Sequence, residues 1–487
     1  MLKNKRVSIV KRSRFYKRRT KIVCTIGPAT GTAAMVGQLI RAGMDVARLN
    51  LSHGLFSKHT RYVQSIRKVS WRLETKVAIL MDLPGPKYRI GKLKDGQAIL
   101  KKGSRLTLTT GQVEGDASLL PVSLPNLSQG VRAGDTVLLD DGAMQLKVEG
   151  IDASEIRCRV TAGGLLIQGR GLVVPGMPAS VPFITEALRK SILFAIEQQP
   201  DYLALSFVSS AEDIAGVKAI LQAKGACIPI IAKIERGEAV KNFDGILRAS
   251  DGIMVARGDL GVEIPLERVP LVQKEIIRKC NRAGKPVITA TEMLESMVEA
   301  VRPTRAETTD VANAIFDGTD ATMLSAETSI GKYPVQAVRM MSKIAQEAEK
   351  KLPYEQMLVE RDGRLESKTD ELISYSACYT ARRLGAVAIV AFTQSGSTAG
   401  RVSKYRPQIP ILAITPAEMI PERLLLHWGV YPLQIASPSS LDELFATGAR
   451  LSKDLGLAKQ GDLIVVTGGI PIGEAGSTNL LKVEKVS

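Results

Sequence analysis

The chain has 487 residues, of which 45% are hydrophobic, 24% charged and only 4% aromatic, and its formal net charge is +17. At roughly 150 residues per domain this length predicts about three domains. The scarcity of aromatic residues argues against the stacking surfaces that bind single-stranded nucleic acid, so we expect no nucleic-acid partner. No apolar stretch approaches the roughly 20 residues of a membrane-spanning helix, and no apolar block near the N-terminus resembles a secretion signal.

The N-terminal arm, residues 1–20, is strongly basic. Lys3 to Lys21 carries ten Lys or Arg residues, and the first acid in the chain is Asp45. Such an arm can bind nucleic acid, an anionic membrane or another subunit, and it also resembles an Arg-rich transit peptide. The plainer interpretation is a solvated tail of about twenty residues before the first strand.

From Lys21 onward, short apolar runs alternate with longer amphipathic segments, which is typical of βα units around a parallel sheet. Helices are predicted at 185–198, 211–224, 267–283 and 304–316. Eight apolar runs are predicted to be strands: 21–27, 45–50, 77–82, 202–207, 229–235, 252–256, 286–290 and 321–325. This pattern predicts an α/β fold, a (β/α)8 TIM barrel built from residues 21–87 and 179–350, with the active site at the carboxyl ends of the strands.

Residues 88–178 break this pattern. They have little helical periodicity and many β-like runs punctuated by glycine, such as 104–110, 136–139 and 156–161. The segment therefore reads as an inserted all-β domain, entered at LPGPK and left at VVPGMP, where prolines and glycines make hinges for a lid.

Residues 351–487 begin a new α/β pattern. A helix-like segment covers 365–384, and buried strands are predicted at 386–392, 411–414 and 462–467. We expect a separate C-terminal α/β domain. Five widely spread cysteines form no C-x-x-C pair, which favours buried thiols in a reducing, cytoplasmic protein and argues against zinc.

The stretch from Ile231 to Gly261 contains IAKIE followed by DGIMVARGDLG. On a strand, Lys233 and Glu235 share one face, and Asp259 follows the next strand. A cation and two carboxylates can hold a divalent metal and neutralise charge on a transferring phosphoryl group. The Lys–Glu pair alone would equally suit an ordinary ion pair inside a barrel, but together with Asp259 it favours phosphoryl chemistry.

The segment VARLNLSHG places Arg48, Asn50, Ser52 and His53 at a strand end and the start of a loop. The planar guanidinium of Arg48 suits a phosphoryl group because it can donate two parallel hydrogen bonds. The alternative is a capped loop with a surface arginine.

Three further hydroxyl-bearing segments have two interpretations each. Thr291 in TATEMLESM, and Ser325 with Glu327 in LSAET, lie where they can contact a substrate or merely cap a helix, which is the commoner role. A loop of small residues leads from a buried strand into a helix and can hold a phosphate or be a plain turn. Its residues are Thr393, Gln394, Ser395, Gly396, Ser397 and Thr398. Walker A and G-x-G-x-x-G signatures are absent, so phosphate needs another arrangement.

Six segments from Lys21 onward are distinctive: KIVCTIGPA, AGMDVARLNLSHG, SDGIMVARGDLGVEIP, ITATEMLESM, PTRAETTDVANAIFDGTDATMLSAET and FTQSGSTAGRVSKYRP. Through these segments, the chain resembles the pyruvate kinase family over nearly its whole length from Lys21. The resemblance implies a barrel with a β lid after strand three and a regulatory C-terminal domain, assembled as a homotetramer. It also implies transfer of the phosphoryl group of phosphoenolpyruvate to ADP, giving pyruvate and ATP in the last step of glycolysis, with Mg²⁺ or Mn²⁺.

The resemblance also assigns roles around the transferred group. Lys233 would stabilise negative charge on that group and on the enolate, and Glu235 and Asp259 would hold the divalent metal. Arg48 would bind the phosphoryl group. The backbone amides of Gly258 and Asp259, with the Thr291 hydroxyl, would bind the substrate carboxylate.

Further roles follow from the same resemblance. Arg89 and Arg170 of the lid would face the nucleotide phosphates, with Asn50 and His53 also at the nucleotide. Thr291 and Ser325 would belong to a water-linked proton relay, whose donor the sequence does not identify.

One departure from the family predicts independence from potassium. Many members read Asp-Thr-Lys-Gly-Pro-Glu after strand three, where this chain reads DLPGPK and ends on Lys87. A fixed ammonium here would replace the monovalent cation, so we expect turnover without added K⁺. The family's cation pocket corresponds to Asn50, Ser52, Asp82, Leu83 and Lys87. The alternative is an exposed hinge lysine.

Other departures concern Glu292, where the family usually has Gln, and the effector region. TQSGST resembles the family's effector-phosphate loop, whereas the later loop 468–477 lacks large or basic side chains. A sugar monophosphate or nucleotide effector is therefore expected.

Two rival functions are another barrel enzyme acting on phosphoenolpyruvate or a keto acid, such as a lyase, and a non-catalytic regulatory paralogue with a nucleic-acid-binding arm. The lyase would need neither the lid nor the effector domain. The set Lys233, Glu235, Asp259, Thr291 and Arg48 argues against the paralogue.

Overall fold

The structure is a computed structural model of the chain. It describes residues 18–123, 127–153, 155–177, 182–362, 367–473, 476 and 478–487. Most of the basic arm, the predicted helix start at 365 and parts of the loop 468–477 lie outside the described residues.

Eight parallel strands close into a barrel in the order β1-β17-β16-β15-β14-β13-β3-β2. Their bounds are β1 (Lys21–Thr25), β2 (Val46–Asn50), β3 (Ala78–Leu83), β13 (Tyr202–Leu205), β14 (Ile230–Ile234), β15 (Gly252–Ala256), β16 (Val287–Ala290) and β17 (Ala321–Leu324). Each predicted run agrees with a strand to within two residues at either end. The closed sheet confirms the predicted (β/α)8 barrel. The prediction is possible because the apolar runs are long enough for strands and too short for helices.

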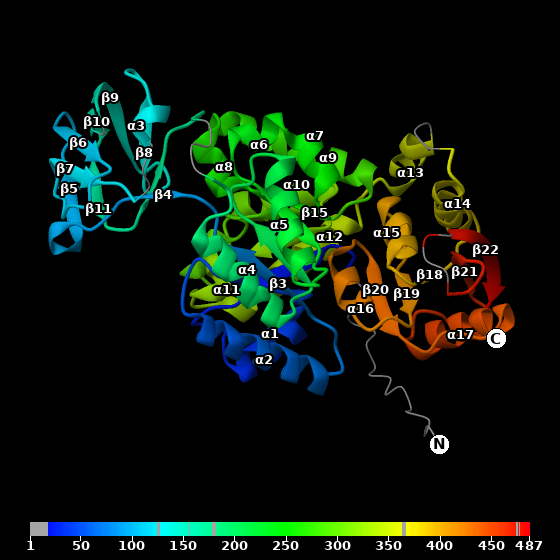
Figure 1. Ribbon diagram of the computed structural model, residues 1–487. Helices are drawn as coiled ribbons and strands as arrows, with labels where there is room; N and C mark the ends of the chain where they lie inside the picture. The colour runs from blue at the N-terminus through cyan, green and yellow to red at the C-terminus, as the bar shows by residue number, and fades with distance from the viewer. Residues whose placement is uncertain are drawn as a thin grey trace. The chain divides into compact units, whose positions relative to one another are not determined.

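The chain forms two compact units. Unit 1 comprises Met1–Asp82, Gln198–Leu203 and Ile277–Ser487, and unit 2 comprises Leu83–Glu197 and Ala204–Ile276. The barrel strands are divided between the two units, and Figure 1 labels the elements of each. The predicted domain boundaries remain a prediction.

Two barrel helices of unit 1, α1 and α10, begin at side chains that cap them. The Thr32 hydroxyl accepts a hydrogen bond from Met35 N–H (3.3 Å), and Thr304 and Glu307 form a capping box, as expected for helix starts. The elements are α1 (Ala33–Ala42), α2 (Phe56–Arg72), η4 (Glu295–Val298), α10 (Arg305–Phe316), α11 (Ala326–Ser329) and α12 (Pro334–Glu349).

Unit 1 also contains a five-stranded sheet in the order β20-β19-β18-β21-β22, in which only β22 pairs antiparallel. The strands are β18 (Ala388–Phe392), β19 (Ile411–Thr415), β20 (Val430–Gln434), β21 (Leu463–Gly469) and β22 (Thr478–Lys485). The helical segments are α13 (Tyr354–Asp362), α14 (Thr369–Arg383), α15 (Ser397–Lys404), α16 (Ile420–Arg423), η5 (Leu424–Leu426) and α17 (Leu441–Asp454).

Helices cover both faces of this sheet, which explains why β18 is apolar throughout (Figure 1). Ala388, Val390 and Phe392 pack with α17, whereas Ile389 and Ala391 pack with α14 and α15. Alternate residues of one strand therefore enter two separate hydrophobic clusters, as expected for a buried, mainly parallel sheet.

In unit 2 the inserted segment folds as β sheets around its own core. The order β4-β12-β8-β9-β10-β6-β7 forms one sheet, and β11 pairs with β5 in a second. The elements are β4 (Tyr88–Arg89), η2 (Lys94–Gly96), β5 (Gln97–Leu100), β6 (Arg105–Thr109), β7 (Leu119–Pro121), α3 (Leu127–Gly130), β8 (Thr136–Leu139), β9 (Met144–Asp152), β10 (Glu155–Ala162), β11 (Gly164–Ile167) and β12 (Gly171–Val173).

The rest of unit 2 carries barrel helices, and α9 continues into unit 1. They are α4 (Glu186–Gln198), α5 (Ala211–Ala223), α6 (Gly237–Lys241), α7 (Phe243–Ala249), α8 (Arg257–Glu263), η3 (Leu266–Arg268) and α9 (Val269–Ala283). The helix predicted from residue 267 therefore starts two residues later, at Val269. Pro270 explains the shift, because proline fits only in the first turn of a helix.

The described end of the basic arm is packed into unit 1. Arg18 is buried and forms an ion pair with Asp45 (2.8 Å), while the backbone N–H of Thr20 donates to the carboxylate of Glu349 (2.7 Å). The prediction of a solvated tail up to residue 20 is therefore wrong for Arg18 and Thr20. The two acids explain the burial, because a buried carboxylate needs cations or donors around it.

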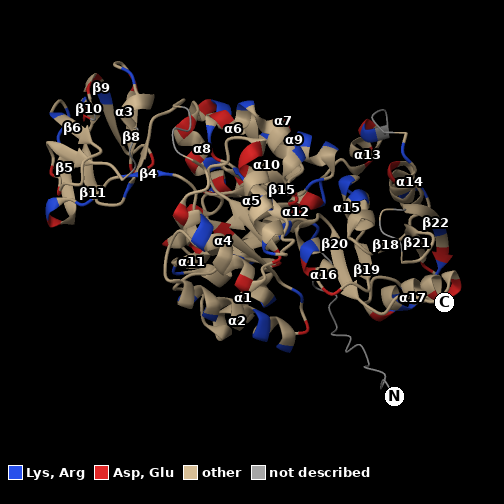
Figure 2. Cartoon of the chain, in the orientation of Figure 1, with Lys and Arg blue, Asp and Glu red and all other residues tan. Residues whose placement is uncertain are grey.

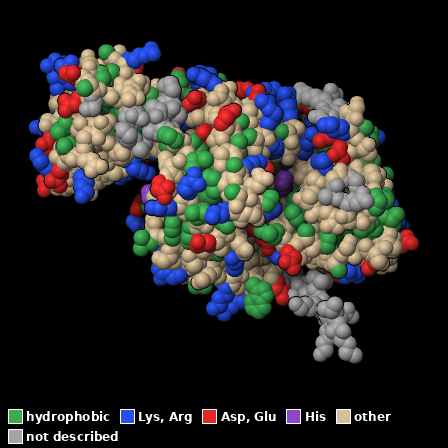
Figure 3. Space-filling view, in the orientation of Figure 1, with side chains coloured by type: hydrophobic (Ala, Val, Ile, Leu, Met, Phe, Trp, Pro, Cys, Tyr) green, Lys and Arg blue, Asp and Glu red, His purple; other side chains and the backbone are tan. Residues whose placement is uncertain are grey.

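Basic and acidic side chains are interspersed on the helices of both units (Figure 2). On the face drawn in Figure 3, blue side chains mix with red, green and tan ones and do not form a single basic patch. Among the described residues, no helix has the length and apolarity needed to cross a membrane. Four of the five free cysteines are buried as expected, but Cys227 is exposed.

Candidate active site

Lys233 and Glu235 form a buried ion pair at the carboxyl end of β14. Lys233 Nζ lies 2.8 Å from Glu235 Oε1, and the two side chains are 9% and 1% exposed. Lys233 also donates to the Ser206 hydroxyl (2.8 Å), and Glu235 Oε2 accepts the Phe207 N–H (2.6 Å). These contacts fix both charges in position at the strand end.

Asp259 lies in the first turn of α8, which begins directly after β15. Its Oδ1 is 2.8 Å from Lys87 Nζ, and Asp141 Oδ1 is 3.4 Å from the same nitrogen. Burial alone would lower the pKa of Lys87, but the carboxylates of Asp259, Asp141 and Glu235 outweigh it and raise that pKa. Both predicted metal ligands, Asp259 and Glu235, thus raise the pKa of Lys87. The Lys87 side chain is 16% exposed, so its interpretation as an exposed hinge lysine is wrong.

A glycine makes room for this lysine. A Cβ added at Gly171 on β12 would come within 2.7 Å of Lys87 Cε. The aliphatic stem thus runs against bare backbone of the inserted sheet, while its ammonium also lies 5.4 Å above the Phe207 ring. We call Lys87, Lys233, Glu235 and Asp259 the lysine–acid cluster.

The lysine–acid cluster has the chemistry of a divalent-metal site completed by substrate. Mg²⁺ is usually bound by one or two carboxylates together with waters and phosphate oxygens of the substrate. Glu235 and Asp259 supply the two carboxylates, and two ammonium groups already lie where positive charge is favourable. No group of three or more Asp, Glu, His or Cys side chains within the described ranges could hold a metal alone. The residues fit a metal shared with a ligand.

In unit 1, Arg48 projects from β2 and is held by Asp82 on the neighbouring β3. Its Nε and Nη2 each lie 2.8 Å from Asp82 Oδ2, and its Nη1 donates to the Thr25 hydroxyl (2.9 Å). Arg48 is only 8% exposed, so the alternative of a surface arginine is wrong. The guanidinium is oriented at the end of a barrel strand.

The loop after β2 exposes the other predicted residues. Asn50 Oδ1 accepts the backbone N–H of Ser52 (3.2 Å), and the side chains of Ser52 and His53 are exposed. His59 Nε2 lies 2.8 Å from the His53 carbonyl oxygen and steadies the loop.

Thr291 follows β16 in an uncommon backbone conformation. Thr291 and Glu292 have φ angles of 64° and 54°, in the left-handed region that disfavours β-branched residues. The Thr291 hydroxyl donates to the carbonyl of Ala290 (2.6 Å) and does not cap the following 3₁₀ turn η4. Two strained residues in succession are typical of a functional turn.

Ser325 follows β17 at the start of α11, but its hydroxyl does not cap that helix. The hydroxyl oxygen is buried and has no hydrogen-bond partner among the described residues. The Glu327 carboxylate instead accepts the N–H groups of Ser325 (2.6 Å) and Leu294 (3.1 Å). The capping interpretation fails for Ser325, and its side chain has hydrogen-bonding capacity to spare.

Within the inserted sheets, Arg89 and Arg170 lie beside one another. Arg89 pairs with Gly171 across β4 and β12, and its Nη1 donates to the carbonyl of Gly169 (3.0 Å). Arg170 forms an ion pair with Asp140 (3.2 Å). The structure thus groups the two arginines predicted for the nucleotide.

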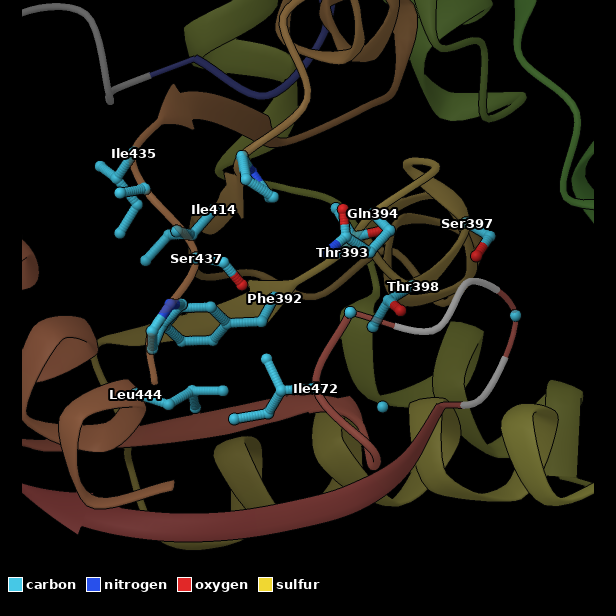
Figure 4. A pocket seen from close by; sticks show the side chains of 16 residues that line it. Phe392, Thr393, Gln394, Ser397, Thr398, Ile414, Ile435, Ser437, Leu444 and Ile472 are labelled. Atoms are coloured by element: carbon cyan, nitrogen blue, oxygen red, sulfur yellow. The ribbon is translucent and has the colours of Figure 1, made fainter. Parts of the chain in front are cut away.

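The loop from Thr393 to Thr398 lines a small pocket between β18 and α15, drawn in Figure 4. Its polar side chains face apolar ones from Phe392, Ile435, Leu444 and Ile472 (Figure 4). The Thr393 hydroxyl accepts the Gly396 N–H (2.9 Å), and Thr398 is hydrogen-bonded to Thr478 (2.8 Å).

The volume of this effector-loop pocket is about 40 Å³, against about 10–15 Å³ for one water. It leaves room for a group of a few atoms, such as a phosphate. No Lys or Arg is among its described lining residues, so hydroxyl and backbone N–H groups would hold the anion.

Three residues that contact the lysine–acid cluster are not predicted as site residues from the sequence: Ser206, Phe207 and Asp141. Ser206 and Phe207 follow β13 directly, so their position at a barrel strand end was a usable signal. Asp141 belongs to a turn of the inserted sheet and has a φ of 52°. Nothing in its local sequence indicates that it lies beside Lys87.

Comparisons with known proteins show which family the chain resembles. Residues 17–338 match the family "Pyruvate kinase, barrel domain", and residues 371–484 match "Pyruvate kinase, alpha/beta domain". The chain is 48% identical to a pyruvate kinase of Geobacillus stearothermophilus over 474 residues, covering 97% of this chain and 81% of that protein. It is 44% identical over 470 residues to a pyruvate kinase of Clostridium acetobutylicum, covering 96% and 99%.

A solved structure is similar as well. The crystal structure of a pyruvate kinase from Cryptosporidium parvum superposes with a TM-score of 0.92 at 37% identity, covering 97% of each chain. Family matches over both the barrel and the C-terminal part account for more than half of the chain. The chain therefore belongs to the pyruvate kinase family and is a phosphotransferase.

Proposed function

We propose that this protein transfers the phosphoryl group of phosphoenolpyruvate to ADP, giving pyruvate and ATP, with Mg²⁺ or Mn²⁺ and without K⁺. We further propose that it works in the cytoplasm as a homotetramer and supplies the last step of glycolysis. The observation that carries the proposal is the lysine–acid cluster, in which Lys233 and Glu235 are 2.8 Å apart and Asp259 opens α8.

Lys233 would stabilise the negative charge that develops during the reaction. Its ammonium is held by the Ser206 hydroxyl and Glu235, so it does not need to reorganise as charge develops on the transferring phosphoryl group and the enolate oxygen. Such preorganised charge is usually the largest single contribution to catalysis.

Glu235 and Asp259 would hold the divalent ion, which polarises the phosphoryl oxygens when bound. The Lys87 ammonium, 2.8 Å from Asp259 Oδ1, would then lie next to the metal. The backbone N–H groups of Gly258 and Asp259 are at the start of α8, where the helix dipole favours a substrate carboxylate.

Arg48 would bind the phosphoryl group, because Asp82 and Thr25 orient its guanidinium. Thr291 would hydrogen-bond the substrate carboxylate. Ser325 would share with Thr291 a water-linked path for the proton that converts the enolate to pyruvate, and the buried, unpartnered Ser325 hydroxyl supports this role.

Arg89 and Arg170 would bind nucleotide phosphates, with Asn50 and His53 contacting the rest of the nucleotide. Lys87 would supply the positive charge that a monovalent cation gives in other members, in a pocket assigned to Asn50, Ser52, Asp82 and Leu83. The effector-loop pocket, Thr393 to Thr398, would take the phosphate of a sugar monophosphate or nucleotide that regulates the enzyme.

The test is pyruvate formation from phosphoenolpyruvate with ADP and Mg²⁺, in buffer whose cations are tetramethylammonium instead of Na⁺ or K⁺. We expect turnover that requires ADP and Mg²⁺ and changes little when K⁺ is added. Release of pyruvate without ADP would instead support a lyase. No product under any condition would support a regulatory paralogue, and light scattering would report the oligomeric state.

A further inference from the structure

A second pocket of unit 1 lies apart from the effector loop. It is walled by α13, the C-terminal end of α14 and the loop 405–409 after α15, and its volume is about 460 Å³. Pockets for small metabolites measure about 300–1,000 Å³. The size suits one small organic molecule, and we call this space the α13–α14 pocket.

The inner wall of the α13–α14 pocket is apolar. Its members also belong to the hydrophobic cluster between the C-terminal sheet and α14 and α15: Leu358, Cys378, Ala381, Ala386 and Tyr405. Tyr354 adds a second aromatic ring to the wall. A wall of this kind favours a flat carbon skeleton over a bare inorganic ion, because rings stack on rings and on aliphatic groups.

The guanidinium group of Arg406 lines this pocket, and that of Arg361 lies close to it. Arg406, 3% exposed, forms an ion pair with Asp320 (2.7 Å), but its Nε is buried and has no hydrogen-bond partner among the described residues. Arg361 on α13 donates to the carbonyl of Lys404. Burial, and then the neighbouring charge of Arg406, lower the pKa of Arg361 to about 10.

Of these two groups, Arg361 leaves its positive charge uncompensated, whereas Arg406 is paired with Asp320. Within the described ranges, Asp320 is the carboxylate paired with Arg406, and no carboxylate is paired with Arg361. At the rim, Arg382 is neutralised by Glu355 (2.8 Å), whereas exposed Arg383 has no acidic partner in the described part of the chain. A buried charge without a partner costs folding free energy, which a bound anion would recover.

The C-terminal end of α14 opposes this effect, since helix carbonyl groups repel an anion. Here the opposition is weakened because those carbonyls are already engaged. The N–H of Leu384 donates to Thr380 (3.0 Å) and that of Ala386 donates to Ala381 (2.9 Å). The charges of Arg361 and Arg383 therefore face a helix end whose carbonyls are already occupied.

We propose that the α13–α14 pocket binds an aromatic organic anion. Its ring would lie against Tyr354 and the apolar wall, and its carboxylate or phosphate would be bound by Arg383, with the charge of Arg361 favouring the anion. Guanidinium groups suit both anions because they donate paired hydrogen bonds.

Trp428 offers a local signal for this binding. Its ring is buried, 6.2 Å from the ring of Tyr354 and 5.5 Å from the Arg406 guanidinium. The chain has two tryptophans, and the other, Trp71, is 81% exposed. The variant Trp71→Phe therefore makes tryptophan emission a reporter of Trp428 alone.

The probe is 8-anilinonaphthalene-1-sulfonate, an aromatic anion that absorbs where tryptophan emits. In the full-length Trp71→Phe chain we expect saturable loss of Trp428 emission, reversed by phenyl phosphate and much less by phenol or inorganic phosphate alone. Adding Arg383→Gln should raise the apparent Kd of the probe about tenfold. The matched control Arg450→Gln removes a remote exposed arginine and should leave the Kd unchanged.

Two more variants locate the probe. Gln408→Glu adds negative charge at the same rim and should also weaken binding, whereas Ser397→Glu in the effector-loop pocket should not. Thermal unfolding of each variant checks that the fold is kept. Unsaturable quenching, equal Kd values for the Arg383→Gln and Arg450→Gln chains, or loss of binding only in Ser397→Glu would each overturn the proposal.

Discussion

Two buried ion pairs of similar length differ in which parts of the chain they join. Lys233 and Glu235 are 2.8 Å apart, and Arg406 and Asp320 are 2.7 Å apart. The first pair joins residues two positions apart at the end of one strand. The second joins residues 86 positions apart, on the barrel and on the loop after α15.

Their remaining partners differ in what they connect. The Asp320 carboxylate also accepts the backbone N–H groups of Val287 (3.0 Å) and Trp428 (3.2 Å), and Arg406 also donates to the carbonyl of Gly318 (2.8 Å). Arg406 and Asp320 thus join the ends of barrel strands to the C-terminal sheet. Burial shows that a charge is costly, whereas the elements that it joins indicate whether it serves the fold or the chemistry.

The largest effect should come from Lys233→Met. We expect kcat to fall about 10³-fold, because a preorganised charge at the reacting group is lost. Steady-state kinetics with phosphoenolpyruvate and ADP measure it, with exposed Lys241→Met as the matched control. Should Lys233→Met retain more than about a tenth of the wild-type kcat, Lys233 would be structural like Arg406.

The second effect concerns stability. Arg406→Met leaves Asp320 buried without its cation, and removing one partner of a buried pair costs about 3–5 kcal/mol. Urea unfolding should show this loss in the free energy of unfolding, while kcat per folded molecule stays within about twofold. The control Arg450→Met removes an exposed partner of Asp454, where we expect at most about 1 kcal/mol. If Arg406→Met lowered kcat strongly and left the free energy of unfolding unchanged, Arg406 would serve the reaction and not the fold.

A third, smaller effect tests Lys87. Lys87→Glu should make turnover depend on K⁺, with at least about tenfold stimulation, because the fixed ammonium is replaced by an acid that needs a cation. Rates in tetramethylammonium buffer with and without K⁺ measure it. Lys92→Glu, on an exposed lysine of the inserted domain, should show no such stimulation. An absolute K⁺ requirement of the unmodified protein would rule out this role.

The smallest effect is the pH dependence of stability from Lys21. Burial lowers the pKa of Lys21 to about 8, so the folded chain binds fewer protons than the unfolded chain between about pH 8 and 10.5. The free energy of unfolding should therefore rise with pH, by about 1 kcal/mol between pH 7.5 and 9. This rise should be missing in Lys21→Met and kept in exposed Lys459→Met. An identical pH dependence of unfolding in all three chains would contradict the shifted pKa.

Much of the fold followed from local sequence patterns. Strand runs such as Gly252 to Ala256 were placed because alternation of short apolar runs with helical segments needs only neighbouring residues to read. The same local signal predicts Lys233, Glu235 and Asp259 as candidate site residues, since strand ends of a barrel are where chemistry is expected.

Partner identities were not predictable, because they depend on residues far apart in the chain. Lys87 and Asp259 are 172 positions apart, and Lys21 lies 409 positions from Val430, whose carbonyl accepts its ammonium (2.6 Å). Periodicity indicates which face a side chain takes but not which distant group meets it. Burial of Arg18 and Lys21 in a basic segment could not be foreseen for that reason.

The turn after β16 has residues that glycine could replace at a lower cost in backbone strain. Left-handed backbone at two non-glycine residues, Thr291 and Glu292, costs on the order of 1–3 kcal/mol each. Glycine would adopt both conformations freely, yet it would bring neither hydroxyl nor carboxylate. Selection for folding alone would favour glycine at this corner, so the two side chains found there indicate a competing demand on the same positions.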